Sequence, residues 1–264
     1  MSLSDPPTPE RDSFARLLRD VEALLRTEEQ VFGGVLLPDD TTSPTPAMSP
    51  AAPPAEDLNL FGPPLPAPPP LSHEPWAGAA SLQELDRMIC TCVKCPLGQT
   101  RTKFVFGVGN PDATLMLIGE APGADEDMQG EPFVGRAGQL LNKILEAINF
   151  RREEVYIANI LKCRPPGNRT PQPDEVELCL PYLRRQIELI RPKVILCLGL
   201  VAAQNLLGTK ESLGRLRGRV LRHGEIPVMV TYHPAALLRN PAWKRPAWDD
   251  VRAARALHDE RLAH

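Results

Sequence analysis

The sequence lacks the features that mark membrane and secreted proteins. No apolar run approaches the roughly 20 residues that a transmembrane helix needs. The first residues do not show the basic and then apolar pattern of a secretory signal peptide. In such a chain, six cysteines favour metal binding or free thiols over a disulfide framework. We therefore expect a cytoplasmic protein.

The chain also has little net charge, −3 over 264 residues, but this value combines two unlike parts. Residues 1–80 hold 16 of the 30 prolines, with 4 Lys+Arg against 12 Asp+Glu. Residues 81–264 hold 26 Lys+Arg against 21 Asp+Glu, which suits a polyanionic partner. We predict an acidic, Pro-rich, largely disordered tail over 1–80, with one amphipathic helix at about 11–31, and one folded domain over 81–264.

Within the domain, short apolar runs alternate with helical patterns. The runs predict four strands, at 114–119, 155–160, 193–199 and 226–232. A capping Ser81 and the apolar periodicity predict helices from residue 82 and over 137–149, 173–190, 200–207 and 247–262. We expect an α/β fold with three layers, α/β/α, around a short, mainly parallel four-stranded sheet. Ligands of such folds bind beyond the carboxyl ends of the strands.

Four cysteines have a spacing that allows them to share one metal site: Cys92, Cys95, Cys163 and Cys179. Four thiolates suit zinc or an iron–sulfur cluster, and the spacing does not decide between the two. Ordinary half-buried thiols are the alternative. Cys90 is a rival for the position of Cys92, whereas Cys197 lies in an apolar strand and is expected to be a core residue.

Two glycine-rich loops follow the first predicted strand. Residues 119–127 carry four carboxylates, including Glu120 and Glu126, and either bind a ligand or form a solvated acidic loop. Residues 130–138 place Phe133 between glycine turns. This ring is either part of the core or a platform on which a planar base stacks.

Asn159 and His233 follow the second and the last predicted strands. A side-chain amide donates and accepts hydrogen bonds at once, as recognition of a pyrimidine edge requires, although Asn commonly caps a turn. A lone His is usually structural. Because His233 reaches the same sheet edge as the acidic loop, Phe133 and Asn159, we favour a functional role for it.

Three blocks of the sequence resemble the signature blocks of the family-4 uracil-DNA glycosylases, which are iron–sulfur enzymes of bacteria and archaea. They are GEAPGADEDMQGEPFVGRAGQLL at 119–141, NILKCRPPGNRTPQPDEVELC at 159–179 and HPAALLR at 233–239. The resemblance covers residues 81–264 in order and includes the cysteine spacing. It implies the fold of that family, excision of uracil from DNA and a monomer that contacts no membrane.

The resemblance also implies roles for individual residues. A structural [4Fe–4S] cluster is implied at Cys92, Cys95, Cys163 and Cys179. Base contacts are implied for Gly119, Glu120, Ala121, Phe133, Asn159 and His233. Among these, Phe133 stacks on uracil, Asn159 reads the pyrimidine edge and His233 bonds the uracil O2.

Cleavage of the N-glycosidic bond leaves a cationic sugar and an anionic base. We expect His233 and backbone N–H groups to stabilise the charge on the base. Glu120 is the first candidate for a carboxylate near the sugar that positions water and favours the cationic sugar. Family-1 uracil-DNA glycosylases carry an Asp at the position where this chain has Ala121. Glu126 is expected to support the loop or the water.

The remaining polar residues near these blocks suggest contacts with DNA. Arg164, together with Lys162 and Arg169, is expected to bind phosphates. Leu237, Leu238 and Arg239 either enter the minor groove or pack before the next helix.

Two other functions stay open from the sequence. The first is a covalent uracil-DNA binder of the same fold, but such proteins carry a basic, His-containing insertion after the Asn159 position that this chain lacks. The second is a four-cysteine metal protein that binds nucleic acid without catalysis.

One apolar island interrupts the Pro-rich tail, at Leu58, Leu60 and Phe61. It resembles the Gln-Leu-x-Leu-Phe peptide with which bacterial replication and repair proteins bind the sliding clamp, with Asp57 in place of the Gln. The island therefore predicts a clamp-binding segment, with a chance cluster or packing against the domain as the alternative.

Overall fold

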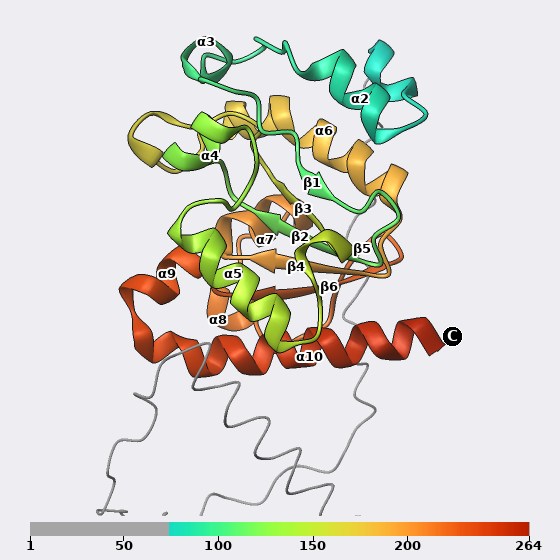
Figure 1. Cartoon of the computed structure of the whole chain (residues 1–264), viewed down its shortest axis with the longest axis vertical. Coiled ribbons are helices and arrows are strands. Elements are labelled where there is room, and N and C mark those ends of the chain that lie inside the picture. The colour runs from blue at the N-terminus through green and yellow to red at the C-terminus, as the bar shows by residue number, and fades with distance from the viewer. Residues whose placement is uncertain (1–73, 264) are drawn as a thin grey trace, which may run out of the picture. The chain divides into compact units, whose positions relative to one another are not determined.

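The computed structural model describes residues 74–263, in which a sheet lies between two layers of helices (Figure 1). The helix predicted over 11–31 and the apolar island at Leu58, Leu60 and Phe61 lie outside the described residues. Within residues 74–263, no helix is both long and apolar enough to cross a membrane.

Six strands form the sheet, in the order β1-β3-β2-β4-β6-β5. The four inner strands are parallel and match the predicted ones to within one residue at each end: β3 (Tyr156–Asn159), β2 (Leu115–Gly119), β4 (Val194–Leu198) and β6 (Ile226–Thr231). The three-layer α/β prediction is confirmed.

The predicted sheet of four strands was too small, because two antiparallel edge strands complete it. These are β1 (Val108–Gly109) and β5 (Leu221–His223). Strands of two and three residues are too short to produce a recognisable alternation in the sequence. Both owe their conformation to pairing with the neighbouring inner strand.

The two helical layers are separated by the sheet. One layer contains α2 (Leu82–Ile89), α6 (Pro173–Ile190) and α7 (Leu200–Leu207), and the other contains α5 (Arg136–Ala147), α9 (Pro234–Arg239) and α10 (Lys244–Ala263). Short helices lie in the connections: η1 (Pro75–Gly78), α3 (Leu97–Thr100), α4 (Ala124–Gln129), η2 (Arg152–Glu154), η3 (Pro166–Asn168), α8 (Leu213–Leu216) and η4 (Pro241–Trp243).

Neighbouring residues of the inner strands face different cores, as the two-residue period of a strand requires. On β2, Met116 and Ile118 pack in the core that includes α6 and α7. Leu117 packs against residues of α5, α9 and α10. Burial on both faces explains why these strands are almost continuously apolar.

The helix ends follow local signals. The Ser81 hydroxyl accepts a hydrogen bond from the backbone N–H of Glu84 at 3.1 Å, so the predicted cap starts α2. Both α6 and α7 have the predicted bounds, and each ends at a residue with left-handed backbone, Arg191 and Gly208.

The ordered core begins before residue 81. Trp76 in η1 is buried, and its ring packs edge-to-face against Tyr182 with the centroids 4.7 Å apart. The last residues of the predicted tail are therefore part of the domain core, since an indole of this size buries a large apolar area.

Candidate active site and cysteine cluster

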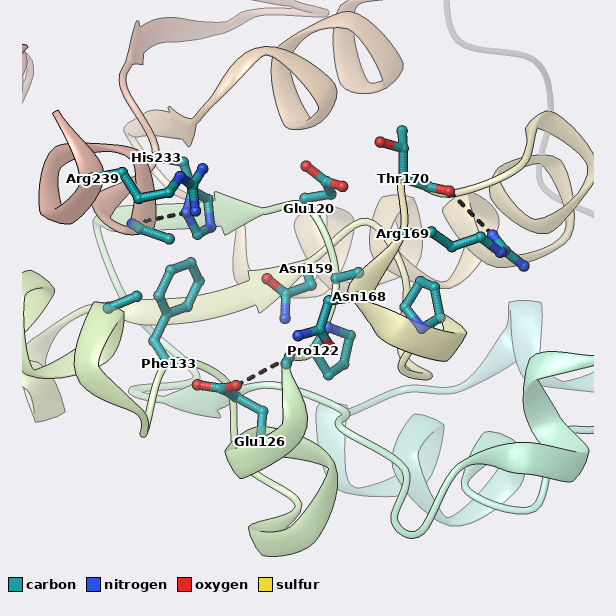
Figure 2. Close-up of a pocket in the computed structure, with 15 residues that line it drawn as sticks. Glu120, Pro122, Glu126, Phe133, Asn159, Asn168, Arg169, Thr170, His233 and Arg239 are labelled. Carbon is teal, nitrogen blue, oxygen red and sulfur yellow. Dashed lines mark hydrogen bonds between the residues drawn. The ribbon is translucent and has the colours of Figure 1, made fainter.

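A cavity of about 420 Å³ opens at the carboxyl ends of the parallel strands. Figure 2 shows Glu120 after β2, Asn159 at the end of β3 and His233 after β6 around this space. Phe133, Ala121, Glu126 and Arg239 also line it. The topology thus gathers side chains from distant parts of the sequence at the edge where α/β folds bind ligands.

Asn159 is 2% exposed, and within the described residues its side-chain oxygen has no hydrogen-bond partner. Gly119 pairs with it across β2 and β3. A Cβ at Gly119 would meet the Asn159 oxygen and lie 2.6 Å from the Phe133 ring. Glycine at this position therefore lets the Asn159 amide and the Phe133 ring lie close to the strand. The unpaired Asn159 oxygen can then accept a hydrogen bond from an N–H of a ligand.

Phe133 holds its ring in the cavity with an unusual backbone, at φ +54°. The ring is 6% exposed and lies 5.4 Å from the His233 ring between centroids, tilted by 31°. Left-handed backbone is costly for a residue with a side chain, so surrounding contacts must maintain it.

Glu126 supplies those contacts. Its carboxylate accepts hydrogen bonds from the backbone N–H groups of Gly123 at 3.0 Å, Val134 at 2.9 Å and Gly135 at 3.0 Å. From the other side, Arg152 donates to the carbonyl of Pro132 at 2.6 Å. Glu126 thus joins the two glycine-rich loops, which is the loop-supporting alternative of the sequence analysis.

His233 has its ring fixed at the start of α9. Its Nδ1 accepts a hydrogen bond from the Ala235 N–H at 3.2 Å, which assigns the proton of a neutral ring to Nε2. Burial and, to a smaller extent, the nearby Arg239 lower the His233 pKa to about 4, whereas Glu126 acts in the opposite direction. At neutral pH the ring is therefore an uncharged N–H donor.

Glu120 is half-buried beside the cavity, and burial raises the pKa of its carboxyl. Its carboxylate receives no hydrogen bond from any residue within 74–263, although its backbone carbonyl accepts one from Leu161. A carboxylate with free lone pairs and a raised pKa suits a base that takes a proton from water. Ala121 beside it offers only a methyl group.

The residues that were expected to contact DNA have different surroundings at the rim of the cavity. Leu237 is buried against the α5 core, so the DNA contact considered for it does not fit the structure, whereas Leu238 is 39% exposed. The Arg169 guanidinium is paired with the buried Glu175 carboxylate at 2.6 Å, and Arg164 donates to Asn168.

The segment after Cys163 also contributes cavity walls that the sequence analysis missed, namely Pro165, Asn168 and Thr170. Nothing in their residue types marks them as site residues. Their position between Cys163 and Cys179 could have identified them, because a metal bound by these cysteines would fix the loop between them.

The four spaced cysteines are free thiols on three segments of the layer that contains α2 and α6. Cys163 and Cys179 are buried, and Cys92 and Cys95 are half-buried. Burial raises the pKa of Cys163, with further contributions from Cys95 and Cys92, and raises that of Cys179 to about 12. Arg101 links two of the segments directly, because its guanidinium donates to the Cys92 carbonyl and to the Cys163 sulfur.

Three of these sulfurs accept hydrogen bonds from the protein. The Tyr182 hydroxyl donates to Cys92 at 3.2 Å, Arg101 to Cys163 at 3.1 Å and the Lys162 backbone N–H to Cys179 at 3.3 Å. Such donors stabilise thiolates that ligate a metal.

The other two cysteines have different surroundings. Cys90 donates to the carbonyl of Arg87 in its own helix at 3.6 Å, and Cys197 is buried in β4 as predicted.

The chemistry of the four thiols determines what this site can bind. Four thiolates are the donor set of both a structural zinc ion and a four-iron cluster. Among the described residues, no group of three or more His, Cys, Asp or Glu side chains is placed to bind a single metal ion. The donors therefore fit a thiolate-bound metal group.

Comparison with known proteins agrees with this geometry. A family model described as the uracil DNA glycosylase superfamily matches residues 106–252. The type-4 uracil-DNA glycosylase of Archaeoglobus fulgidus is 51% identical over 169 residues, which cover 61% of this chain and 85% of the relative. Those of Pyrobaculum aerophilum (47%, covering 61% and 86%) and Sulfurisphaera tokodaii (41%, covering 67% and 84%) are also similar. Likeness of this extent means that the chain belongs to the type-4 uracil-DNA glycosylases.

Proposed function

We propose that the protein repairs DNA by flipping uracil into the cavity and hydrolysing its N-glycosidic bond, which leaves an abasic site. The observation that carries the proposal is the meeting of Phe133, Asn159 and His233 around one cavity, with the Asn159 oxygen left unpaired. Relatives at 51% and 47% identity are named type-4 uracil-DNA glycosylases. A base inside a duplex is out of reach of such a cavity, so extrusion must come first.

Recognition of the base follows from two side chains. Phe133 offers a ring on which the flipped base stacks. The Asn159 amide accepts from the N–H of the uracil edge and donates to the adjacent carbonyl, a pattern that cytosine does not match. At the rim, Arg239 and the exposed Leu238 contact the DNA strand.

The reaction needs charge stabilisation at two places. When the bond between C1′ and N1 breaks, its electron pair leaves with the base and the sugar becomes cationic. The neutral His233 donates from Nε2 to the uracil O2, where negative charge develops, a stabilisation worth several kcal/mol. Water adds to C1′, and the Glu120 carboxylate accepts the proton that the water loses.

Release of free uracil from uracil-containing DNA tests the function. The wild-type protein releases uracil, and Asn159→Ala slows release by about 10²-fold, because binding and orientation of the base are lost. Asn205→Ala removes an amide that bonds its own helix outside the cavity, so this control keeps the wild-type rate. A DNA adduct that survives denaturation without free uracil would instead identify a covalent binder. Binding without either product would identify a non-catalytic protein.

We also propose that Cys92, Cys95, Cys163 and Cys179 hold a [4Fe–4S] cluster. The four-thiol donor set and the three hydrogen-bond donors to its sulfurs support it. A bound cluster supplies a cross-link between the segments that carry its ligands. Those segments include the loop that walls the cavity.

A third proposal concerns the apolar island in the tail. Leu58, Leu60 and Phe61 are proposed to bind the sliding clamp, which would raise the local concentration of the enzyme at replicating DNA. A peptide spanning the island should bind the clamp of the same organism in a titration, and Leu60→Ala with Phe61→Ala should abolish binding. Absence of binding, or binding that is insensitive to both changes, would rule the segment out.

A further inference from the structure

Lys162, which the sequence predicted to bind DNA phosphates, is fully buried, so that prediction is wrong. It lies between Asn159 of the cavity and Cys179. Its Nζ donates to the backbone carbonyl of Asn159 at 3.0 Å and to the side-chain oxygen of Gln186 at 2.6 Å. Fully buried lysines are rare because the ammonium loses its hydration, so such a residue needs strong compensation. Neither base binding nor the chemical step proposed above uses this side chain.

Gln186 fixes the position of the Lys162 ammonium. It is also fully buried, and its amide nitrogen donates to the Phe106 carbonyl at 3.0 Å and to the Tyr156 hydroxyl at 3.3 Å. Tyr156 is the first residue of β3, the strand that ends at Asn159. The ammonium therefore contacts the last residue of β3 directly and the side chain of its first residue through Gln186.

The backbone of Lys162 is tied to the cysteines. Its N–H donates to the Cys179 sulfur at 3.3 Å, and the next residue is Cys163. Its carbonyl accepts a hydrogen bond from the Val105 N–H at 2.9 Å. One residue thus contacts a proposed cluster ligand through its main chain and the base-reading residue through its side chain.

We propose that Lys162 is a positioning residue. Through its contacts, the conformation of the cysteine segment determines how firmly Asn159 is held. The inference rests on the proposed function and on the proposed cluster. The carbonyl of Asn159 belongs to the residue whose amide must meet the uracil edge, so holding this carbonyl holds the backbone from which the side chain extends. A functional group that binds a ligand works only when the surrounding contacts hold it in place.

The test compares Lys162→Met with Lys193→Met, which removes an exposed ammonium. Three quantities are measured on full-length protein: iron per chain, affinity for free uracil, and the single-turnover rate of uracil release. We expect Lys162→Met to keep its iron and to bind free uracil about tenfold more weakly, because Asn159 is then held less firmly in the geometry that uracil needs. Lys193→Met should match the wild type in all three.

A double-mutant cycle separates positioning from general support. If Lys162 acts through Asn159, Lys162→Met slows uracil release about tenfold in the wild-type background and has little further effect in Asn159→Ala. Equal losses in both backgrounds, or unchanged uracil affinity in iron-loaded Lys162→Met, would overturn the proposal.

If Lys162→Met loses its iron, Gln186→Leu takes its place, because Gln186 makes no hydrogen bond to a cysteine among the described residues. Iron-loaded Gln186→Leu should bind free uracil several-fold more weakly, and wild-type affinity would again overturn the inference. A wild-type protein that releases no uracil would contradict the proposed function itself, which is a separate outcome.

Discussion

Around the cysteines the protein donates hydrogen bonds to the reactive atoms, whereas in the cavity it leaves them free. The sulfurs of Cys92, Cys163 and Cys179 each accept a bond from a tyrosine, an arginine or a backbone N–H. The side-chain oxygens of Asn159 and Glu120 accept none from the residues that the structure describes. Asn159 is as buried as Cys163 and Cys179, so exposure to water does not explain the difference for its amide, whereas Glu120 is half-buried and lines the open cavity.

The difference follows from what each site binds. An unpaired buried oxygen lowers the stability of the free protein by about 1–3 kcal/mol. A ligand that donates a hydrogen bond to this oxygen removes the penalty when it binds. A thiolate that ligates a metal has lone pairs left over, and donors from the protein satisfy them permanently. In the substrate site, polar atoms are therefore left unpaired so that the ligand can bond to them. In the structural site, the protein itself supplies the hydrogen bonds.

We expect the largest effect from a substitution that removes one of the four cysteine ligands. Cys163→Ala should reduce bound iron from about four atoms per chain to almost none, with loss of the brown colour and of solubility. Iron analysis and the visible spectrum of anaerobically prepared protein measure this.

Cys90→Ala is the matched control and should keep its iron, because its thiol bonds a carbonyl of its own helix. Stoichiometric zinc without iron in the wild-type protein would contradict the cluster.

A change in the cavity should leave the cysteine site intact. His233→Ala should lower the single-turnover rate of uracil release by 10²-fold or more with almost unchanged DNA affinity, because the Nε2 donor acts on charge that develops in the transition state. Iron content should stay at the wild-type value. His223→Ala, in β5 and away from the cavity lining, is the control. An unchanged rate would remove His233 from the mechanism.

A smaller effect is expected when the loop support is weakened. Glu126→Gln keeps the shape of the side chain but replaces one acceptor oxygen with a donor that opposes backbone N–H groups. We expect uracil release to slow about tenfold, since the Phe133 backbone loses its support. Glu131→Gln changes an exposed carboxylate of the second glycine-rich loop, which contains Phe133, and should have no effect. Equal rates for the two variants would show that Phe133 does not depend on Glu126.

The smallest effect concerns pH. The Glu120 pKa is raised by burial, so its carboxylate is lost as the pH falls through this raised value, and the rate should drop several-fold on acidification. The His233 pKa is lowered to about 4, so the ring stays neutral through the same range. Glu120→Gln should therefore abolish the pH dependence of the remaining activity. A dependence that persists in Glu120→Gln and vanishes in His233→Ala would assign the titration to His233 instead.

Local patterns were sufficient for most of the fold. The inner strands, the bounds of α6 and α7 and the Ser81 cap depend on residues close in the sequence, and all were predicted. The side chains that gather at the strand ends were also predictable from the sequence. Parallel strands bring their carboxyl ends to one edge of the sheet whatever the details of packing.

Contacts between distant residues decided the rest. The edge strands form only by pairing, and Leu237 and Leu238 are equally apolar until packing buries one of them. The left-handed Phe133 and the tautomer of His233 depend on hydrogen bonds that form after the loops meet. The sequence by itself determined which chemical groups reach the site. Only the tertiary structure decided which of them are paired, because a hydrogen-bond partner far along the chain leaves no local pattern.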